Sequence, residues 1–270
     1  MENSNTNIII RRARKEDENE LAALAYRAYY DRFFNPAVTD KNGASLRLYP
    51  ELVPDEQKDT GQSASTFRDY WAKAMPKLDS DDQTFICYVA EAQTPQGRKI
   101  VGFRKGYAAP LEENEYRRYQ TENKKRLLLR KRDDYYGINT YNDTRPIPLP
   151  AREKMAGSSS LYIDPAYKRE GLGRRLIQSY AFELLQRGFE GMMTSCYIYN
   201  DSQKFLRSVG GDFFIKCEIP VSYKKDNRQT DIRNIPGLMC MWDKAALQKL
   251  AYGGKTEKTM PRKISSAYAR

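Results

Sequence analysis

The sequence predicts an α+β fold, an α/β sandwich with one mixed central sheet of about seven strands flanked by helices. The first observation is that β-prone apolar runs alternate with amphipathic stretches along most of the 270 residues. The second is a strand–loop–helix–strand run from Ser159 to Tyr199, which favours a right-handed parallel crossover. The third is that two polar stretches, residues 35–82 and 110–157, interrupt the pattern, and we interpret them as insertions.

The N-terminal part of the chain supplies the first strands and the first helix of this fold. Asn7–Arg14 is apolar and β-prone. Glu16–Phe34 shows helical spacing, and Asp17 is placed to cap or charge-stabilise its first turn. Gln83–Ala92 and Lys99–Ala108 are two further predicted strands, and the turn-forming residues between them favour a hairpin.

The C-terminal part continues the alternation of strands and helices. Paired glycines at Gly210 and Gly211 are typical of the end of a helix. We expect one domain over residues 1–243, followed by a basic, partly disordered tail over residues 244–270. The elements expected here are a strand at Gly191–Tyr199, a helix at Asp201–Val209, strands at Asp212–Tyr223 and Ile235–Trp242, and a polar loop at Lys224–Asn234.

The two insertions differ in charge. Residues 35–82 are net acidic, which would suit a cationic amine, and are irregular apart from a helix expected near Thr66–Met75. In residues 110–157, a charged helical stretch at Glu113–Asp134 precedes a loop at Tyr135–Pro150. Basic residues interleaved with tyrosines resemble a nucleic-acid surface, whereas a helix with both signs of charge is typical of a solvated face. No specific RNA-binding motif supports nucleic acid as a partner.

The composition excludes several kinds of chemistry. The chain has no histidine, which removes Ser-His-Asp and Cys-His catalysis, imidazole bases and His-ligated sites, and we expect no metal. The four cysteines form no CxxC pair and lie in apolar runs, as is typical of core residues in a reducing compartment. A catalytic thiol at Cys196 is the alternative. The net charge of +11 would attract a phosphorylated cofactor, nucleic acid or an anionic membrane surface.

The location of the protein is predicted from what the sequence lacks. The N-terminus does not resemble a signal peptide, and no apolar run approaches the ~20 residues of a membrane-spanning helix. We therefore expect a soluble cytoplasmic protein without a membrane partner. The oligomeric state stays open, a dimer included.

The main functional signal lies in Leu161–Gly188. A short strand leads through a basic loop, Asp164–Glu170, into a long amphipathic helix that opens at Gly171. The first N–H groups of a helix have no partner within it and lie at the positive end of its dipole, so they bind anions such as a pyrophosphate. Gly171 and Gly173 let a ligand approach the backbone closely because they have no Cβ atom.

This stretch resembles motif A of the GNAT N-acetyltransferase superfamily, V-x-P-x-x-[QR]-x-x-G-x-[GA]. Ile163 stands at the valine, Pro165, Gly171 and Gly173 match, and the cationic Lys168 stands where Gln or Arg is usual. The order of strands and helices agrees over most of the chain, outside the insertions and the tail. The resemblance implies the GNAT fold and an acetyl-CoA-dependent N-acetyltransferase.

By this resemblance, acetyl-CoA would be the co-substrate that donates the acetyl group. Its pantetheine arm would run along the strand before the loop and pair with it like an extra strand. Backbone N–H groups of the loop would hold its pyrophosphate. The residues implied are Leu161, Tyr162 and Ile163 for the arm, and Lys168, Arg169, Gly171, Leu172, Gly173 and Arg174 for the phosphates.

A second stretch, Asn200–Phe213, resembles the family's second motif. Asn200 would hydrogen-bond the pantetheine, and Phe205 would pack beside it. The family's usual tyrosine, which protonates the departing CoA thiolate in many relatives, has no counterpart here. Tyr197 and Tyr199 on the adjoining strand are candidate substitutes, and solvent is also adequate because a thiol of pKa ~8.5 is a fair leaving group.

The general base is predicted less specifically. A carboxylate, often through water, can take the proton of the attacking amine. Glu91, near the end of a predicted central strand, and Glu153, just before the motif strand, are the candidates. A surface carboxylate without a catalytic role is the alternative for each.

Three functional hypotheses remain. The first is an N-acetyltransferase that transfers an acetyl group to a primary amine of a small molecule or protein, by direct attack in a ternary complex. The second is a catalytically silent GNAT-like module that binds CoA or RNA through its basic surface. The third is an acyltransferase that uses a longer acyl or aminoacyl donor.

Overall fold

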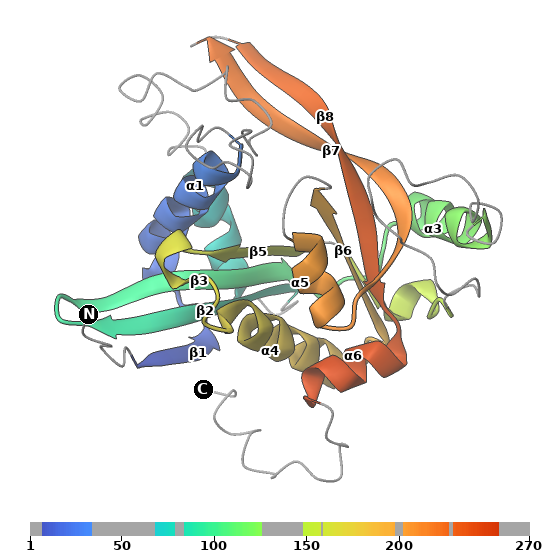
Figure 1. Cartoon of the computed structure of the whole chain (residues 1–270), viewed down its shortest axis with the longest axis horizontal. Coiled ribbons are helices and arrows are strands. Elements are labelled where there is room, and N and C mark those ends of the chain that lie inside the picture. Colours follow the sequence, from blue (N-terminus) through green and yellow to red (C-terminus); the bar gives the residue numbers. More distant parts are fainter. Residues whose placement is uncertain are drawn as a thin grey trace. The chain divides into compact units, whose positions relative to one another are not determined.

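The computed structural model describes residues 7–33, 68–78, 84–125, 148–157, 159–197, 202–226 and 229–253. The predicted α+β class is confirmed, because the strands form sheets with helices packed on them (Figure 1). The chain divides into two compact units. The first unit contains residues 1–106 and 160–180, and the second contains residues 107–159 and 181–255. The boundary at residue 180 therefore falls within the helix α4 (Leu172–Gln186).

The first unit is built on a four-stranded sheet. Its strand order is β1-β2-β3-β5, and β5 is therefore an edge strand. β1 and β2 pair antiparallel, from Ile8 opposite Ala92 to Arg12 opposite Tyr88. The hairpin predicted between β2 and β3 is present, with a two-residue turn before Gly97. The strands are β1 (Ile8–Arg12), β2 (Phe85–Thr94), β3 (Gly97–Tyr107) and β5 (Ser159–Ile163).

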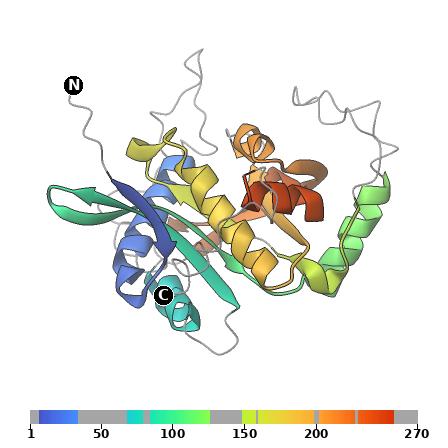
Figure 2. The ribbon, with the colours of Figure 1, turned by 90° about the horizontal axis from the view of Figure 1, so that it is seen from below.

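Helices cover both faces of this sheet (Figure 2). Adjacent residues of a strand point to opposite faces of the sheet. On β3, Gly102 lies against Leu176 of α4, whereas the ring of Phe103 contacts that of Trp71, with 5.1 Å between centroids. The two faces of β3 therefore pack on different helices. The helical segments are η1 (Lys15–Asp17), α1 (Glu18–Phe33), residues 68–74, η3 (Met75–Leu78), η5 (Pro165–Tyr167) and α4 (Leu172–Gln186).

The second unit contains a second four-stranded sheet, in the order β4-β6-β8-β7. β4 and β6 are parallel, while β6–β8 and β8–β7 are antiparallel. The strands are β4 (Met155–Ala156), β6 (Gly191–Tyr197), β7 (Asp212–Asp226) and β8 (Gln229–Trp242). The helices are α3 (Glu113–Lys125), η4 (Arg152–Lys154), α5 (Ser202–Ser208) and α6 (Lys244–Ala251).

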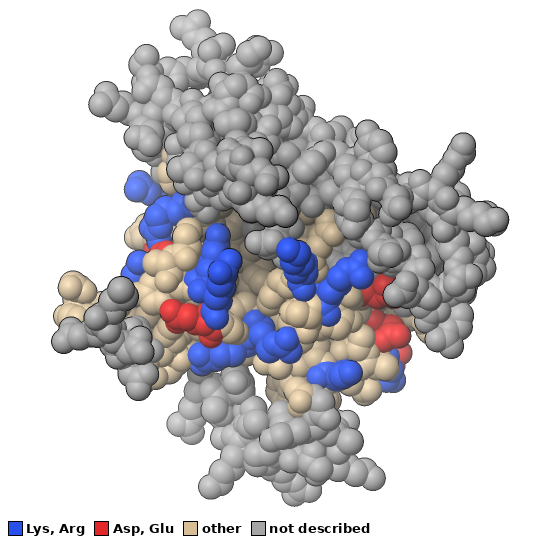
Figure 3. Space-filling view, in the orientation of Figure 1, with Lys and Arg blue, Asp and Glu red and all other residues tan. Residues whose placement is uncertain are grey.

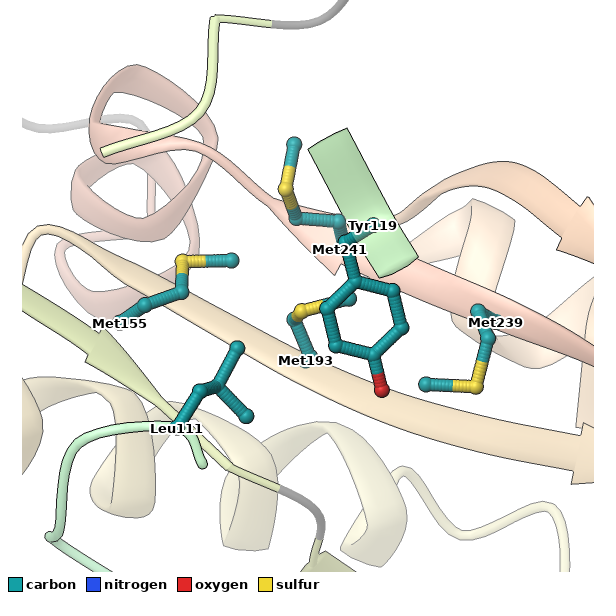
Figure 4. Close-up of a cluster of buried hydrophobic side chains, with 6 residues drawn as sticks. All are labelled: Leu111, Tyr119, Met155, Met193, Met239 and Met241. Carbon is teal, nitrogen blue, oxygen red and sulfur yellow. The ribbon is translucent and has the colours of Figure 1, made fainter. Parts of the chain in front are cut away.

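One face of the second sheet carries a cluster rich in methionine. Met193 of β6 lies opposite Met241 of β8, and Met155 and Met239 extend the same face. Figure 4 shows these side chains gathered around Leu111 and Tyr119 of the insertion. The insertion therefore contributes to the core of this unit, since α3 provides an aromatic cover for flexible thioether side chains.

The opposite face of this sheet packs against α5 and the residues that end it. The indole N–H of Trp242 donates to the Val209 carbonyl at 2.9 Å. The predicted glycine cap is confirmed, because Gly210 has a φ of +84° and the N–H of Gly211 donates to the Leu206 carbonyl at 2.9 Å. Large residues on both faces thus bury β6 and β8.

The single central sheet predicted from the sequence is replaced by two sheets of four strands in the described ranges. The predicted right-handed parallel crossover within one central sheet was wrong, because the strands that flank α4 lie in different sheets, β5 in the first and β6 in the second. The strand parallel to β6 is β4, with Met155 opposite Gly191. Local apolar patterns indicate that a strand exists, whereas its hydrogen-bond partner depends on pairing across long sequence distances.

The predicted polar loop at Lys224–Asn234 was also wrong. β7 and β8 remain paired as far as Asp226 opposite Gln229. β6 pairs with β8 only up to Gly237, so the hairpin continues beyond the sheet as a two-stranded ribbon. Backbone hydrogen bonds hold such a ribbon without the apolar alternation that predicts a half-buried strand.

The start of the predicted C-terminal tail is folded. α6 begins after Asp243, whose carboxylate accepts from the N–H of Ala246 at 2.8 Å, and Leu247 and Leu250 are buried. Residues 254–270, like most of the acidic insertion and residues 126–134 of the predicted charged helix, lie outside the described ranges. The domain limits at residue 243 stay a prediction.

Candidate functional site

The turn from β5 into α4 is organised by Asp164. Its N–H donates to the Val101 carbonyl at 2.8 Å, which ends the pairing of β5 with β3. Its carboxylate then accepts from the N–H of Ala166 at 3.1 Å and caps η5, whose first residue is Pro165. An aspartate followed by proline is therefore the local signal that turns the strand into the loop.

The same carboxylate is buried and holds the loop to two other elements. The guanidinium of Arg27 in α1 lies 3.5 Å from Asp164, and the ammonium of Lys99 in β3 lies 3.2 Å from it. Lys99 also lies over the ring of Tyr167, at 5.5 Å from its centroid. These contacts fix the entry of the loop against the sheet and α1.

The second half of the loop has left-handed backbone. Arg169 has a φ of +72° and Gly171 a φ of +75°, and Arg169 is the one non-glycine residue with a positive φ in the described ranges. Such a conformation costs a residue with a Cβ atom roughly 1–2 kcal/mol, and strained backbone clusters at functional sites. The two left-handed residues turn the chain so that α4 begins immediately at Leu172.

The first turn of α4 leaves its leading N–H groups outside the helical hydrogen-bond ladder. The N–H of Arg175 donates to the Gly171 carbonyl at 3.1 Å and begins the helical hydrogen-bond ladder. The N–H groups of Leu172, Gly173 and Arg174 precede this bond, so they point out of the helix start at the positive end of its dipole. This geometry is that of an anion-binding helix N-terminus.

Cations surround this helix start. Lys168, Arg169 and Arg174 are exposed, whereas Leu172 is buried and anchors the first turn in the core. Arg175 donates to the Ile8 carbonyl at 2.8 Å and thus ties the first turn of α4 to β1. Figure 3 shows Lys and Arg side chains gathered over the part of the first unit where Figure 1 draws η5 and the start of α4.

The three residues predicted to line an extended arm lie on β5. Leu161, Tyr162 and Ile163 are each half-buried on this edge strand. Tyr162 stacks on Phe103, with 4.9 Å between ring centroids. A Cβ atom at Gly102 would lie 2.7 Å from the Cδ1 of Ile163, so the glycine lets β5 pack closely on β3. The structure therefore brings these three residues and the basic loop together in one unit.

Comparison with models of known protein families identifies the family of this chain. The model of the acetyltransferase (GNAT) family matches residues 60–210, more than half of the chain, and includes the loop and α4. The chain belongs to the GNAT acetyltransferase family. The resemblance inferred from the loop motif is thus confirmed. No curated protein sequence matches this GNAT chain.

Three solved structures illustrate the similarity of this GNAT chain to others. An acetyltransferase of the GNAT family from Streptococcus pneumoniae is 14% identical, covering 88% of this chain and 99% of that one, with a TM-score of 0.47. An N-acetyltransferase from Staphylococcus aureus is 16% identical, covering 88% and 98%, with a TM-score of 0.47. A phosphinothricin acetyltransferase from Sinorhizobium meliloti, in complex with acetyl-CoA, is 12% identical, covering 94% and 92%, with a TM-score of 0.45.

The candidate residues of the second motif are only partly described. Tyr197 ends β6 and is half-buried, and Phe205 is half-buried in α5. Tyr199 and Asn200 lie outside the described residues. Their roles stay predictions, as does the role of Tyr197.

The two candidate bases have different surroundings. Glu153 is exposed on η4 and lies 3.8 Å from the guanidinium of Arg152. Glu91 is buried in β2 and accepts from Arg11 at 2.5 and 2.8 Å. Arg98 also lies 3.6 Å from Glu91, so its carboxylate is part of an ion-pair cluster. The contacts of Glu91 support a structural role, and its catalytic role stays a prediction.

The cysteines and the acidic residues show no further site in the described ranges. Cys87, Cys196 and Cys240 are buried and Cys217 is half-buried, and none of them forms a disulfide. No group of three Cys, Asp or Glu side chains in this part of the chain is arranged to hold a metal ion. Nor does any described helix combine the length and the apolar character needed to cross a membrane.

Sequence reasoning missed the role of Asp164 in holding the loop entry. The local signal was present, because an aspartate directly before a proline is typical of a helix N-cap. Its partners Arg27 and Lys99 could not be found in this way, since they are distant in sequence and meet Asp164 only in the folded unit.

Replacing Asp164 by alanine should therefore destabilise the protein. The variant loses the cap of η5 and leaves Arg27 and Lys99 without this carboxylate, and we expect a loss of about 1–2 kcal/mol in the free energy of unfolding. Asp164→Asn keeps an oxygen that accepts from Ala166 and should lose less. Urea unfolding of the two variants checks this, and equal losses would show that the cap hydrogen bond contributes nothing.

Proposed function

We propose that this GNAT chain is an N-acetyltransferase that transfers the acetyl group of acetyl-CoA to a primary amine of a small molecule or protein. The observation that carries the proposal is the loop from Asp164 to Gly171. It presents two left-handed residues and exposed cations beside the first N–H groups of a 15-residue helix. Family membership supports acetyl-CoA as the anion that this loop receives.

The residues present fit the donor. Its pyrophosphate would lie on the N–H groups of Leu172, Gly173 and Arg174, with the side chains of Lys168, Arg169 and Arg174 supplying positive charge. Its pantetheine arm would run along β5, where Leu161, Tyr162 and Ile163 form an edge strand. An edge strand can pair with one further extended segment. Asp164 would act as a positioning residue, because its contacts with Arg27 and Lys99 hold the loop entry.

The proposed chemistry is direct attack in a ternary complex. The amine loses a proton, its nitrogen attacks the thioester carbonyl carbon, the C–S bond breaks and CoA leaves as a thiol. Backbone N–H groups of β5 would polarise the carbonyl oxygen. Glu91 or Glu153 would take the proton of the amine, and Tyr197 or Tyr199 would protonate the departing thiolate, with solvent as the alternative proton donor.

Acetyl-CoA binding and thiol release test this function. The protein should gain thermal stability with rising acetyl-CoA concentration and release free thiol when it is offered a mixed library of amines. Gly173→Glu should abolish both effects, because a carboxylate at this position fills and repels the phosphate site. The wild-type fold, followed by circular dichroism, should persist in the variant.

The outcomes separate an enzyme from a binding module. If acetyl-CoA neither binds nor stabilises the protein, the proposal fails. If acetyl-CoA binds and no amine in the library causes thiol release, while RNA binds with a steep salt dependence, a silent binding module is the better account. Release of thiol only from a longer acyl-CoA would shift the proposal to a different acyl donor.

A further inference from the structure

A lysine on β3 lies in an unusual environment in the first unit. The Nζ atom of Lys105 lies 3.5 Å from the ring centroid of Tyr70 and 5.5 Å from that of Trp71. Both rings belong to the helical residues 68–74. Such contacts stabilise a cation on aromatic faces. In the part of the chain that the structure describes, no carboxylate forms an ion pair with Lys105, and the neighbouring ionisable group is the buried thiol of Cys87 on β2.

Lys105 lies on the same side of the sheet as a residue proposed to line the donor arm. Phe103 and Lys105 are two residues apart on β3 and both contact Trp71, so they share a face. Tyr162 of β5 stacks on Phe103 on this face. Lys105 and the donor strand are therefore connected through one aromatic cluster, made of Tyr70, Trp71, Phe103 and Tyr162.

Strand spacing sets the distance between the donor and this lysine. β3 is the immediate neighbour of the edge strand β5. An arm that pairs with the outer edge of β5 would lie two strand spacings from β3, or about 10 Å. A lysine side chain spans roughly 6 Å from Cα to Nζ, so the acetyl end of the arm would have to cover the remaining ~4 Å from its own side.

We infer that Lys105 is a site of self-acetylation, at which the protein transfers the acetyl group of its own bound acetyl-CoA. This inference rests on the proposed function, which supplies the donor. The neutral amine of Lys105 attacks the thioester carbonyl carbon, a C–N bond forms, the C–S bond breaks and CoA leaves as a thiol. The proton lost by the amine passes to solvent or to the thiolate, and the product is a neutral amide.

The protonation of Lys105 supports this reactivity. Burial lowers the pKa of Lys105 to about 8. Burial raises the pKa of Cys87, so that thiol stays neutral. Among the described residues, Tyr70 is a second ionisable side chain in contact with Lys105. Near neutral pH, the neutral fraction of such an amine is roughly 200 times that of a lysine with an ordinary pKa.

Mass spectrometry of the purified full chain with acetyl-CoA and no added amine tests the inference. Acetylation of Lys105 should exceed that of Lys73 by at least about tenfold in initial rate. Lys73 is a matched control, because it is exposed on the same helical segment as Tyr70. The rate at Lys105 should level off above pH about 8. Lys105→Arg should remove this acetylation, and Lys73→Arg should leave it unchanged.

Three results would overturn the inference. The first is acetylation of Lys105 no faster than that of Lys73, and the second is that Lys105 stays unmodified. The third is equal acetylation of Lys105 in Gly173→Glu, which would show that the lysine reacts with unbound acetyl-CoA. Calorimetric titration of acetyl-CoA into the same samples distinguishes the two proposals. If acetyl-CoA binds while Lys105 stays unmodified, only self-acetylation fails, whereas absence of binding removes both.

Discussion

Gly171→Val should abolish tight binding of acetyl-CoA while the protein still folds. Gly171 has a φ of +75°, a region that a β-branched residue adopts only with strain of about 1–3 kcal/mol. The described structure leaves open space around a Cβ atom at this position, so no buried clash adds to the strain. The substitution instead reshapes the loop and places methyl groups where the phosphates would approach. We expect at least a tenfold rise in Kd, or ~1.4 kcal/mol or more, by calorimetry.

Gly97→Val is the matched control for this prediction. Gly97 lies in the turn between β2 and β3, has a φ of +109° and also has open space around its Cβ position. The control should lose a similar free energy of unfolding and keep its acetyl-CoA affinity. If both variants lose affinity equally, general destabilisation explains the effect and the loop is not the donor site.

Asp17→Ala should cause the largest loss of stability among the variants considered. The carboxylate of Asp17 is fully buried and pairs with Arg11 at 2.7 Å and Arg98 at 3.1 Å, while accepting from the N–H of Arg14 at 2.8 Å. Removing it leaves the half-buried guanidinium of Arg11 with Glu91 as its remaining acidic partner. Breaking a buried ion pair in this way costs about 3–5 kcal/mol, which urea unfolding measures directly.

Glu16→Ala provides the contrast from the neighbouring position. The Glu16 and Arg14 side chains are more than half exposed and lie 3.8 Å apart, so their pair contributes less than about 1 kcal/mol. Similar losses in the two variants would contradict the assignment of Asp17 as the centre of a buried cluster.

The stability conferred by Asp17 should depend on pH with a defined sign. Burial raises the pKa of Asp17, but hydrogen bonds from Arg11 and the Arg14 N–H, with the charges of Arg11 and Arg98, lower it below its ordinary value overall. A depressed pKa stabilises the fold above the pKa of the unfolded chain, ~3.9, and this contribution is lost as pH falls through the folded value. The difference between wild type and Asp17→Asn should therefore shrink below pH ~4 and stay constant near neutrality.

Asp17 also illustrates how sequence and structure differ in what they reveal. The sequence indicates a helix start near this acidic residue, and the structure has η1 and α1 there. The expected role was to cap or charge-stabilise that first turn. The structure places Asp17 in a buried cluster with residues of β1, β2 and β3. In the register of β1 on β2, Arg11 lies opposite Val89 and diagonal to Glu91, and it pairs with both Asp17 and Glu91.

The sequence by itself determined the fold class, the loop and its helix. Each of these depends on short-range chemistry: the period of apolar residues, an Asp-Pro step and glycines at fixed spacing act within a few residues. Gly171 was expected from the sequence to allow close approach of a ligand, and the structure adds that its backbone is left-handed.

Only the tertiary structure decided which distant groups meet. It separated the strands into two sheets, extended the pairing of β7 and β8 into a polar ribbon, and folded α6 from the start of the predicted tail. It also joined Asp164 to Arg27 and Lys99, and Lys105 to two aromatic rings. Strand partners, ion pairs and burial arise from contacts between segments far apart in the chain, and such contacts leave no periodic trace in the sequence.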